Sequence, residues 1–456
     1  MQTVNHIPAK KDSFLAWLVV LSAALFFFYE FIQMNMFDAI NANLMRDFNL
    51  NATQISNLSS SFFWADMLFV FPAGLLLDRF STRRILLITM GACVVGTFLF
   101  ASAKSFGFAF ATHFLVGISD AFSFLCALIL ASRWFHADRQ ALITGMVVTF
   151  AMLGGVIAHS PVAYLVERMG WHQAMVVNGF LGIALWALMW FTVQDKPKHA
   201  VLSHAEMVKN HPFWPGLWHA LRNFQNWGAG LFTGLTNLPL MVLGGLWGNT
   251  FLKQVHHFGS AEATTISSML FMGTIFGSPF FGQLSDKIKN RRSPMFVGAV
   301  VSLALSLFMI YGHYDSFWFG ATLFFALGFA TSCQILSYPI ITASNPAHIT
   351  GTALGLSASI IMASAALCQQ FFGVWLDKLS QGQMLNGVAF YSDKTFESAM
   401  LIFPLTLVAS LILVLLLKEP KHDKKNDVVI NNSVIPAKAG IELKNPIKTG
   451  SLLSQE

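Results

Sequence analysis

The sequence predicts an all-α membrane protein in which twelve transmembrane helices form two six-helix halves. Its composition, its apolar runs and a repeated loop support this fold class. Of the 456 residues, 55% are hydrophobic and only 11% are charged, whereas soluble domains carry about 25% charged residues. Because so few charges cannot cover a water-facing surface, we expect lipid to contact much of the protein.

The apolar runs are long enough to cross a bilayer, since a spanning helix needs about 20 mostly apolar residues. The first half, residues 14–193, contains runs at 14–40, 54–77, 84–103, 108–135, 140–166 and 172–193. The second half, residues 227–417, contains runs at 227–252, 263–286, 294–312, 316–340, 349–377 and 397–417. Residues 1–13 precede the halves, a polar linker at 194–226 separates them, and the polar tail 418–456 has too few apolar residues to fold.

The distribution of Lys and Arg among the loops orients the predicted helices. One set of loops, which includes residues 79–84 and 287–292 together with both chain ends, holds most of these residues. Cytoplasmic loops carry the excess of Lys and Arg, so both termini are expected to be cytoplasmic. The formal net charge of +6 does not indicate nucleic-acid binding, because the basic residues lie in short loops between apolar runs.

A loop motif that occurs once in each half is the strongest signal in the sequence. The first copy contains Gly74, Asp78, Arg79, Arg83 and Arg84. The second copy has the same spacing and contains Gly282, Asp286, Lys287, Arg291 and Arg292. Each copy follows the second predicted helix of its half. Two repeated halves around a central path are typical of transporters.

These loops resemble the signature loop of the major facilitator superfamily, and the resemblance extends to the helix count and the midpoint linker. It implies a secondary transporter whose halves rock around a central site to give alternating access. Gly74 and Gly282 would let adjacent helices pack closely. Asp78 and Asp286 would pair with Arg, or accept from a helix N-terminus, across the cytoplasmic mouth, and so favour the state closed to the cytoplasm.

Two weaker resemblances concern the branch and the source. The start of the chain is similar to the lysosomal dipeptide-transporter branch of this family in Tyr29-Glu30, Arg46-Asp47 and Asn51-Ala-Thr53. In the tail, residues 434–441 resemble peptides read through from interspersed repeats in Gram-negative genomes. A multi-pass protein of the bacterial inner membrane is therefore expected.

Ionisable residues within the predicted helices are candidates for coupling or substrate binding, namely Glu30, Asp66, Asp120 and His159. A charge buried in lipid costs at least about 2.5 kcal/mol, so such residues are functional candidates by default. The family resemblance implies a cavity position for Glu30 on the first helix. Asp66 is expected near mid-membrane, and Asp120 in the outer half of the fourth run. These groups predict a proton as the co-ion.

In the second half, Asn237 and Trp247 of the seventh run, and Gln334 and Tyr338 of the tenth, are candidates to line the cavity. Amides and aromatic rings suit hydrogen bonding and stacking with a polar organic solute. We therefore predict a monomeric, proton-coupled transporter for a small solute such as an amino acid, a dipeptide or an organic acid.

Other functional classes fit the sequence less well. A siderophore or drug exporter of the same fold, and a non-transporting membrane receptor, are the alternatives. An enzyme is not expected, because the sequence has no HExxH motif, no GxSxG motif and no phosphate-binding Gly-rich loop. The cysteines lack metal-ligand spacing, so neither a metal nor a cofactor is expected.

Overall fold

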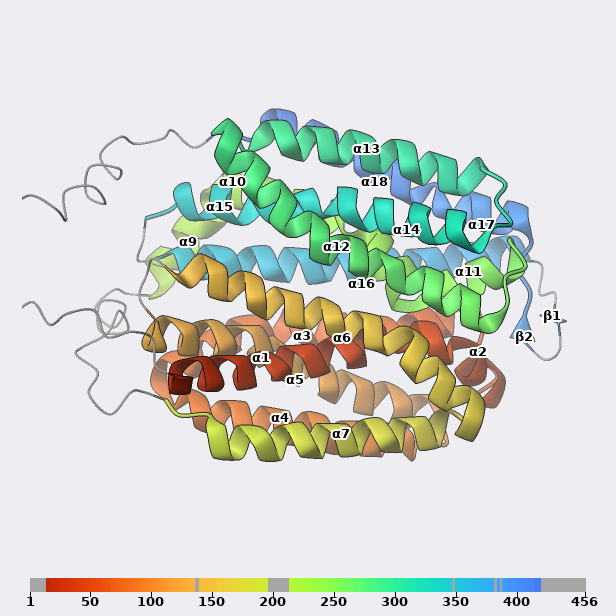
Figure 1. The fold of residues 1–456 in the computed structure, drawn as a ribbon, viewed down its shortest axis with the longest axis horizontal. Helices are drawn as coiled ribbons and strands as arrows, with labels where there is room; N and C mark the ends of the chain where they lie inside the picture. The colour runs from red at the N-terminus through yellow and green to blue at the C-terminus, as the bar shows by residue number, and fades with distance from the viewer. Residues whose placement is uncertain are drawn as a thin grey trace, which may run out of the picture. The chain divides into compact units, whose positions relative to one another are not determined.

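The computed structural model describes residues 14–135, 139–195, 213–346, 349–380, 384–385 and 388–419, and almost all of them are helical (Figure 1). The predicted N-terminal segment 1–13, residues 196–212 of the predicted linker and residues 420–456 of the predicted tail lie outside the described residues.

The first half consists of α1 (Phe14–Asn35), α2 (Phe37–Asp47), α3 (Ala52–Arg79), α4 (Thr82–Ala101), α5 (Phe106–Trp134), α6 (Gln140–Met169) and α7 (Trp171–Thr192). The first predicted run is thus divided at Met36 into α1 and α2. Polar caps mark where helices begin. The side chain of Asn51 accepts from the Gln54 backbone N–H at the start of α3, and Ser105 accepts from Phe108 at the start of α5. Such caps satisfy N–H groups that lack a partner in the first turn.

The second half begins with α9 (Phe213–Arg222), α10 (Phe224–Thr236), the π-helix η2 (Leu240–Trp247) and α11 (Gly248–Gln254). It continues with α12 (Ser260–Ile288), α13 (Arg292–Tyr311), α14 (Phe317–Thr331), the 3-10 helix η3 (Ser332–Leu336), α15 (Ser337–Ala343) and α16 (Thr350–Ser380). The two-residue strands β1 (Met384–Leu385) and β2 (Val388–Ala389) pair in an antiparallel manner before α17 (Asp393–Met400) and α18 (Ile402–Leu416).

The predicted spans correspond to helices or broken helices. Ten helical segments of the described residues are long and apolar enough to cross a membrane, and α10 together with η2 and α11, bent by 41°, makes eleven. The 29-residue helix α12 is not among them, because Ser, Thr and Gly residues lower its mean hydropathy. It packs against α6 and α14, so part of its surface faces protein instead of lipid. The fold is that of an all-α membrane protein.

The halves join where α3 packs along α16 and α6 packs along α12. In Figure 1 the first half, coloured red to yellow, lies below the second half, coloured green to blue. The close approach of α16 to α3 requires Gly373, because a Cβ atom there would overlap the Ser56 hydroxyl and the Ala52 carbonyl oxygen.

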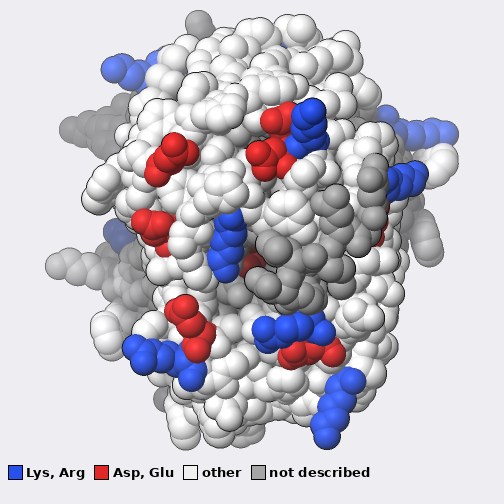
Figure 2. Space-filling model, turned by 90° about the vertical axis from the view of Figure 1, so that its right-hand side faces the viewer, with Lys and Arg blue, Asp and Glu red and all other residues white. Residues whose placement is uncertain are grey.

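The two ends of the helix bundle differ in charge. The loops α3–α4 and α12–α13 carry the repeated motif, and we call the end that contains them the basic end. The opposite end contains α2, α11 and the β1–β2 pair. Figure 2 shows the opposite end, where acidic and basic side chains intermingle and neither sign dominates.

Candidate functional site

Three buried carboxyl groups gather inside the first half, from Glu30 on α1, Asp66 on α3 and Asp120 on α5. Glu30 interacts electrostatically with Asp120 and Asp66, and Asp66 interacts with Asp120. Asp120 is equally distant from Phe106 and Trp134, the ends of α5. It therefore lies at the middle of its helix. The structure thus brings together Glu30, Asp66 and Asp120, which the sequence had singled out. We call these three residues the acid cluster.

Glu30 is the least satisfied member of the acid cluster. It has no exposed surface, and neither of its carboxylate oxygens has a hydrogen-bond partner. The Cys93 thiol of α4 lies beside it, but a thiol is only a weak donor. Asp120 by contrast accepts from the Ser123 hydroxyl at 2.9 Å. Among the described residues, no Lys or Arg forms an ion pair with the cluster.

Asp38 on α2 connects the two halves and was missed from the sequence. Its Oδ1 accepts from the backbone N–H of Asn249 on α11 at 2.8 Å, and its Oδ2 accepts from the Ser267 hydroxyl on α12 at 2.8 Å. Nε2 of His159 on α6 lies 3.3 Å from the same Oδ2. Asp38 and His159 belong to the first half, whereas Asn249 and Ser267 belong to the second. The side chains of Asp38, His159 and Ser267 and the backbone N–H of Asn249 form a contact between the halves, which we call the Asp38 latch.

One hydrogen bond shows which ring nitrogen of His159 carries a proton. Nδ1 of His159 lies 2.7 Å from the carbonyl oxygen of Gly155. A carbonyl oxygen only accepts, so Nδ1 must carry a proton. An unprotonated Nε2 facing an ionised Asp38 would place two acceptors against each other. The contact between Nε2 and Asp38 is an ion-pair contact without a hydrogen bond, and it is favourable when Nε2 carries a proton.

Asp38 could have been predicted by the rule that selected Glu30, namely that an ionisable residue within a predicted span is a functional candidate. It lies inside the predicted run 14–40, but two residues from the end of that run, where an acid resembles an ordinary interfacial residue. Its pairing with His159 depends on how α2 packs against α6. No spacing in the sequence encodes that contact.

Further contacts between the halves lie near the Asp38 latch, at the opposite end. The Asp377 carboxylate of α16 accepts from the backbone N–H groups of Ala52 and Thr53, at 2.9 and 2.7 Å, and so caps α3. Nδ2 of Asn41 on α2 donates to the carbonyl oxygen of Leu246 on η2 at 2.9 Å. These bonds close the opposite end by joining helices of different halves.

Trp247, a predicted cavity residue, takes part in the same closure. Its side chain is fully buried, and its Nε1–H donates to the Ser56 hydroxyl of α3 at 3.2 Å. Its ring packs near the rings of Phe372 and Tyr391. Trp247 therefore fills the contact between the halves in this conformation.

Two predicted amides of the second half meet where its spans are broken. Nε2 of Gln334 on η3 donates to Oδ1 of Asn237 at 2.8 Å, and Asn237 lies at the bend between α10 and η2. Transporters place substrate sites at such interruptions of spanning helices. Tyr338 on α15 is 37% exposed.

Asp195, which follows α7, organises the first copy of the repeated loop at the basic end. It accepts from the Ser81 hydroxyl and from the Arg83 backbone N–H, the latter at 2.9 Å. Nη1 of Arg133 lies 3.5 Å from the same carboxylate. Nη2 of Arg83 donates to the Trp190 carbonyl oxygen at 2.8 Å. Asp195 thus caps α4 and ties α4, α5 and α7 together.

Glu419, which follows α18, has the equivalent position in the second half. Its two carboxylate oxygens accept from the backbone N–H groups of Arg291 and Arg292, at 2.8 and 3.1 Å. The Arg292 guanidinium donates to carbonyl oxygens at the end of α18. Asp286 lies 3.4 Å from Arg291 and is 72% exposed. The sequence repeat therefore has a structural counterpart in two acids outside the motif, which sequence reasoning missed.

One expectation for the repeated loops is wrong, and another stays a prediction. Gly74 and Gly282 do not mediate close packing, because a Cβ atom at either position would meet no described atom within 4 Å. The described contacts of Arg83, Asp286, Arg291 and Arg292 stay within their own halves, and Arg79, Arg84 and Lys287 are exposed. Asp78 ends α3, but its side chain lies outside the described part of the structure. The latch across the basic end therefore stays a prediction.

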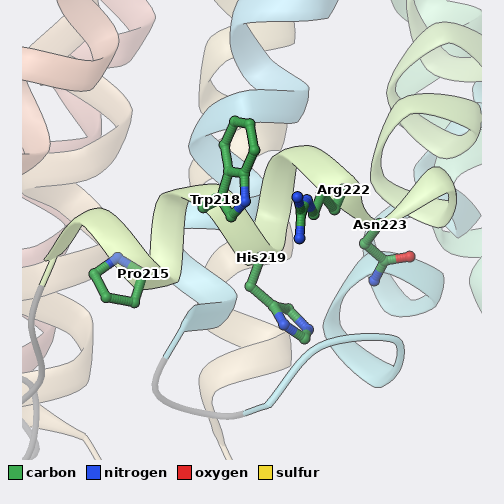
Figure 3. A pocket seen from close by; sticks show the side chains of 5 residues that line it. All are labelled: Pro215, Trp218, His219, Arg222 and Asn223. Atoms are coloured by element: carbon green, nitrogen blue, oxygen red, sulfur yellow. The ribbon is translucent and has the colours of Figure 1, made fainter.

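A surface hollow of about 440 Å³ lies along α9 and is lined by Pro215, Trp218, His219, Arg222 and Asn223 (Figure 3). The Arg222 guanidinium lies 4.7 Å from the ring centre of Trp218. An exposed Trp beside an Arg is typical of a membrane–water interface. None of these residues belongs to the acid cluster or the Asp38 latch, so the hollow is separate from the candidate transport residues.

Comparison with known proteins identifies the family. Residues 20–368 match the family model described as Major Facilitator Superfamily. The probable galactarate/D-glucarate transporter GudP of Bacillus subtilis is 24% identical over 380 residues, which cover 76% of this chain and 83% of that protein. The probable hexose phosphate transport protein of Chlamydia pneumoniae is 25% identical over 357 residues, which cover 70% of this chain and 76% of that protein.

The fold also matches solved structures. The inward-facing, unoccupied structure of a bacterial homologue of the human lysosomal transporter Spinster has a TM-score of 0.68 at 16% identity. The match covers 89% of this chain and 96% of that one. The relatives are transporters, and the family model spans well over half of the chain. This multi-pass membrane protein is therefore a secondary transporter and not an enzyme, and it belongs to the major facilitator superfamily.

Proposed function

We propose that the protein is a proton-coupled transporter that moves a small polar organic solute across the bacterial inner membrane by alternating access, acting as a monomer. The excess of Lys and Arg supports a cytoplasmic position for the basic end and both termini. The Asp38 latch is the observation that carries the proposal, because it joins a titratable pair to the junction between the two halves.

The contacts between the halves support an alternating-access cycle. Asp38, Asn41, Ser56 and Asp377 all bond across the halves at the end that is extracellular in this orientation. At the basic end, the described ion pairs and loop contacts stay within each half. These contacts support a conformation that is closed to the outside, and opening it would require the Asp38 latch to separate.

A proton arriving from outside would weaken the Asp38 latch. With one proton the His159–Asp38 pair is favourable, but a second proton removes the carboxylate charge. Hydrogen bonds to a charged acceptor are about twice as strong as neutral ones, so the bonds from Asn249 and Ser267 would weaken as well. Lys253 on α11 also interacts electrostatically with Asp38 and would no longer be attracted. The acid cluster, nearer mid-membrane, offers the next proton acceptors.

The test measures the distance between spin labels at Ala42 on α2 and Ala261 on α12, both exposed at the opposite end. In the otherwise unaltered protein we expect a short distance that lengthens as the pH falls, because a second proton separates the latch. Asp38→Asn should give the long distance at every pH.

Asp47→Asn is the matched control, because Asp47 is on the same helix but accepts from Trp171 Nε1 at 2.7 Å within its own half. It should retain the pH response. If Asp38→Asn kept both the short distance and the pH response, the latch would play no part in coupling.

A further inference from the structure

The short helix α9 exposes a face that takes no part in the described contacts between the halves. Pro215, Trp218, His219 and Arg222 recur at spacings of three and four residues and are all exposed, so they share one face of the helix. The other side, which includes the buried Ala220, packs against α10 and α16. In Figure 3, α9 runs across the helices behind it. This arrangement is typical of a helix that lies in the plane of a membrane–water interface.

The hollow along this face carries positive charge without a counter-charge. The Arg222 guanidinium lies 4.7 Å from the ring centre of Trp218. In the part of the chain that the structure describes, Arg222 forms no ion pair, and none of the five residues that line the hollow is acidic. A guanidinium presents paired N–H donors that match two oxygens of a phosphate group. The hollow therefore suits a phosphate.

Exposed aromatic side chains continue from the hollow onto the next helix. Trp218 of α9 is exposed, as are Phe224 and Trp227 of α10. Nε1 of Trp227 donates to the Leu221 carbonyl oxygen at 2.8 Å, so this ring lies against the end of α9. Tryptophan is enriched at the level of the lipid headgroups. A lipid whose phosphate contacts Arg222 would cover these rings, whereas a small soluble phosphate would leave them in water.

We infer that the hollow along α9 binds the headgroup of an anionic phospholipid, with Arg222 contacting its phosphate. A zwitterionic headgroup would bring an ammonium group, and no acidic residue lines the hollow to receive it. The hollow lies at the basic end (Figure 1), and basic pockets on the cytoplasmic side of helix bundles bind anionic headgroups. None of its residues belongs to the Asp38 latch, so the inference does not depend on proton coupling.

The test measures lipid binding to the purified full-length protein by native mass spectrometry in detergent. Phosphatidylglycerol is compared with phosphatidylethanolamine of the same acyl chains, and with glycerophosphoglycerol, which is the same headgroup without acyl chains. We expect phosphatidylglycerol to bind at the lowest concentration. Arg222→Gln should weaken the tightest binding of phosphatidylglycerol about tenfold, because it removes charge-assisted hydrogen bonds to the phosphate.

Two control variants separate the hollow from other positive charges. Arg168→Gln is the matched control, because Arg168 lies 5.3 Å from the ring centre of Tyr164, also four residues earlier, but at the opposite end and next to Glu167. Lys289→Asn removes an exposed charge at the basic end, outside the hollow. Both variants should bind phosphatidylglycerol as tightly as the unaltered protein.

Four results would overturn the inference. Unchanged affinity in Arg222→Gln would remove Arg222 as the phosphate contact. An equal loss in Lys289→Asn would show a general attraction of the basic end for anionic lipid. Equally tight binding of phosphatidylethanolamine would contradict selection of an anionic headgroup. Equally tight binding of glycerophosphoglycerol would make the hollow a site for soluble phosphate esters instead of a lipid.

Discussion

At the scale of single residues, one acid at the end of each half has the same role in both halves. Asp195 accepts from one backbone N–H group at the start of α4, and Glu419 accepts from two at the start of α13, so each caps an earlier helix of its own half. The conspicuous motif acid Asp286 has only an exposed ion pair with Arg291. Surface ion pairs contribute about 0–1 kcal/mol, whereas hydrogen bonds to charged groups contribute about 1.5–3 kcal/mol.

Asp195→Asn and Glu419→Gln are therefore expected to lower the melting temperature of the purified protein, each by an amount equivalent to about 1–2 kcal/mol. Asp286→Asn should change it little. Thermal unfolding in detergent measures all three. Equal losses in the three variants would show that the caps contribute no more than an exposed ion pair.

The functional residues that could be predicted from the sequence differ from those that could not in whether their importance depends on contacts formed by folding. Glu30, Asp66 and Asp120 were identifiable because an acid in an apolar run is unusual wherever its helix packs. Asp38, Asp195 and Glu419 lie at the ends of runs, where acids are common. Their importance comes from contacts with distant parts of the chain, and those contacts exist only after the helices pack.

At the scale of helices, close packing depends on particular glycines and not on those of the repeated motif. A Cβ atom at Gly328 on α14 would overlap the backbone carbonyl group of Leu270 on α12. A Cβ atom at Gly355 on α16 would meet nothing within 4 Å. The two positions thus form a matched pair within the second half.

Gly328→Ala should destabilise the protein by about 1–3 kcal/mol, because α14 must move away from α12. Gly355→Ala should be neutral or stabilise slightly, since Ala favours a helix over Gly by about 1 kcal/mol. The measurement is again the melting temperature. A Gly328→Ala protein as stable as the unaltered one would mean that the two helices separate without cost.

Most of the helices were predictable, but the interruptions within them were not. A run of apolar residues predicts where a chain crosses the membrane, and the loop repeat predicted α12 in spite of its polar residues. The bend before η2 and the 3-10 segment η3 depend on local backbone bonding, including Pro239, which cannot donate at the bend. The Asn237–Gln334 bond that links the two breaks joins spans about a hundred residues apart.

At the scale of the whole molecule, the contacts that hold the opposite end together and the titratable pair that we propose to sense protons are neighbouring but different. Asp377 caps α3 from the other half, so losing this cap should favour opening without removing the titratable His159–Asp38 pair. A helix cap contributes about 0.5–2 kcal/mol, which corresponds to a population shift of about two- to thirtyfold.

Asp377→Asn should therefore increase the fraction of molecules with the long Ala42–Ala261 spin-label distance at neutral pH, and that fraction should still rise as the pH falls. Ser105→Ala is the matched control, because it removes the cap of α5 within the first half. It should lower the melting temperature but leave the distance distribution unchanged. An unchanged distribution in Asp377→Asn would mean that this cap is retained when the opposite end opens, and the opening motion would then have to occur at the other contacts between the halves, those of α2 with η2, α11 and α12 and of α3 with η2.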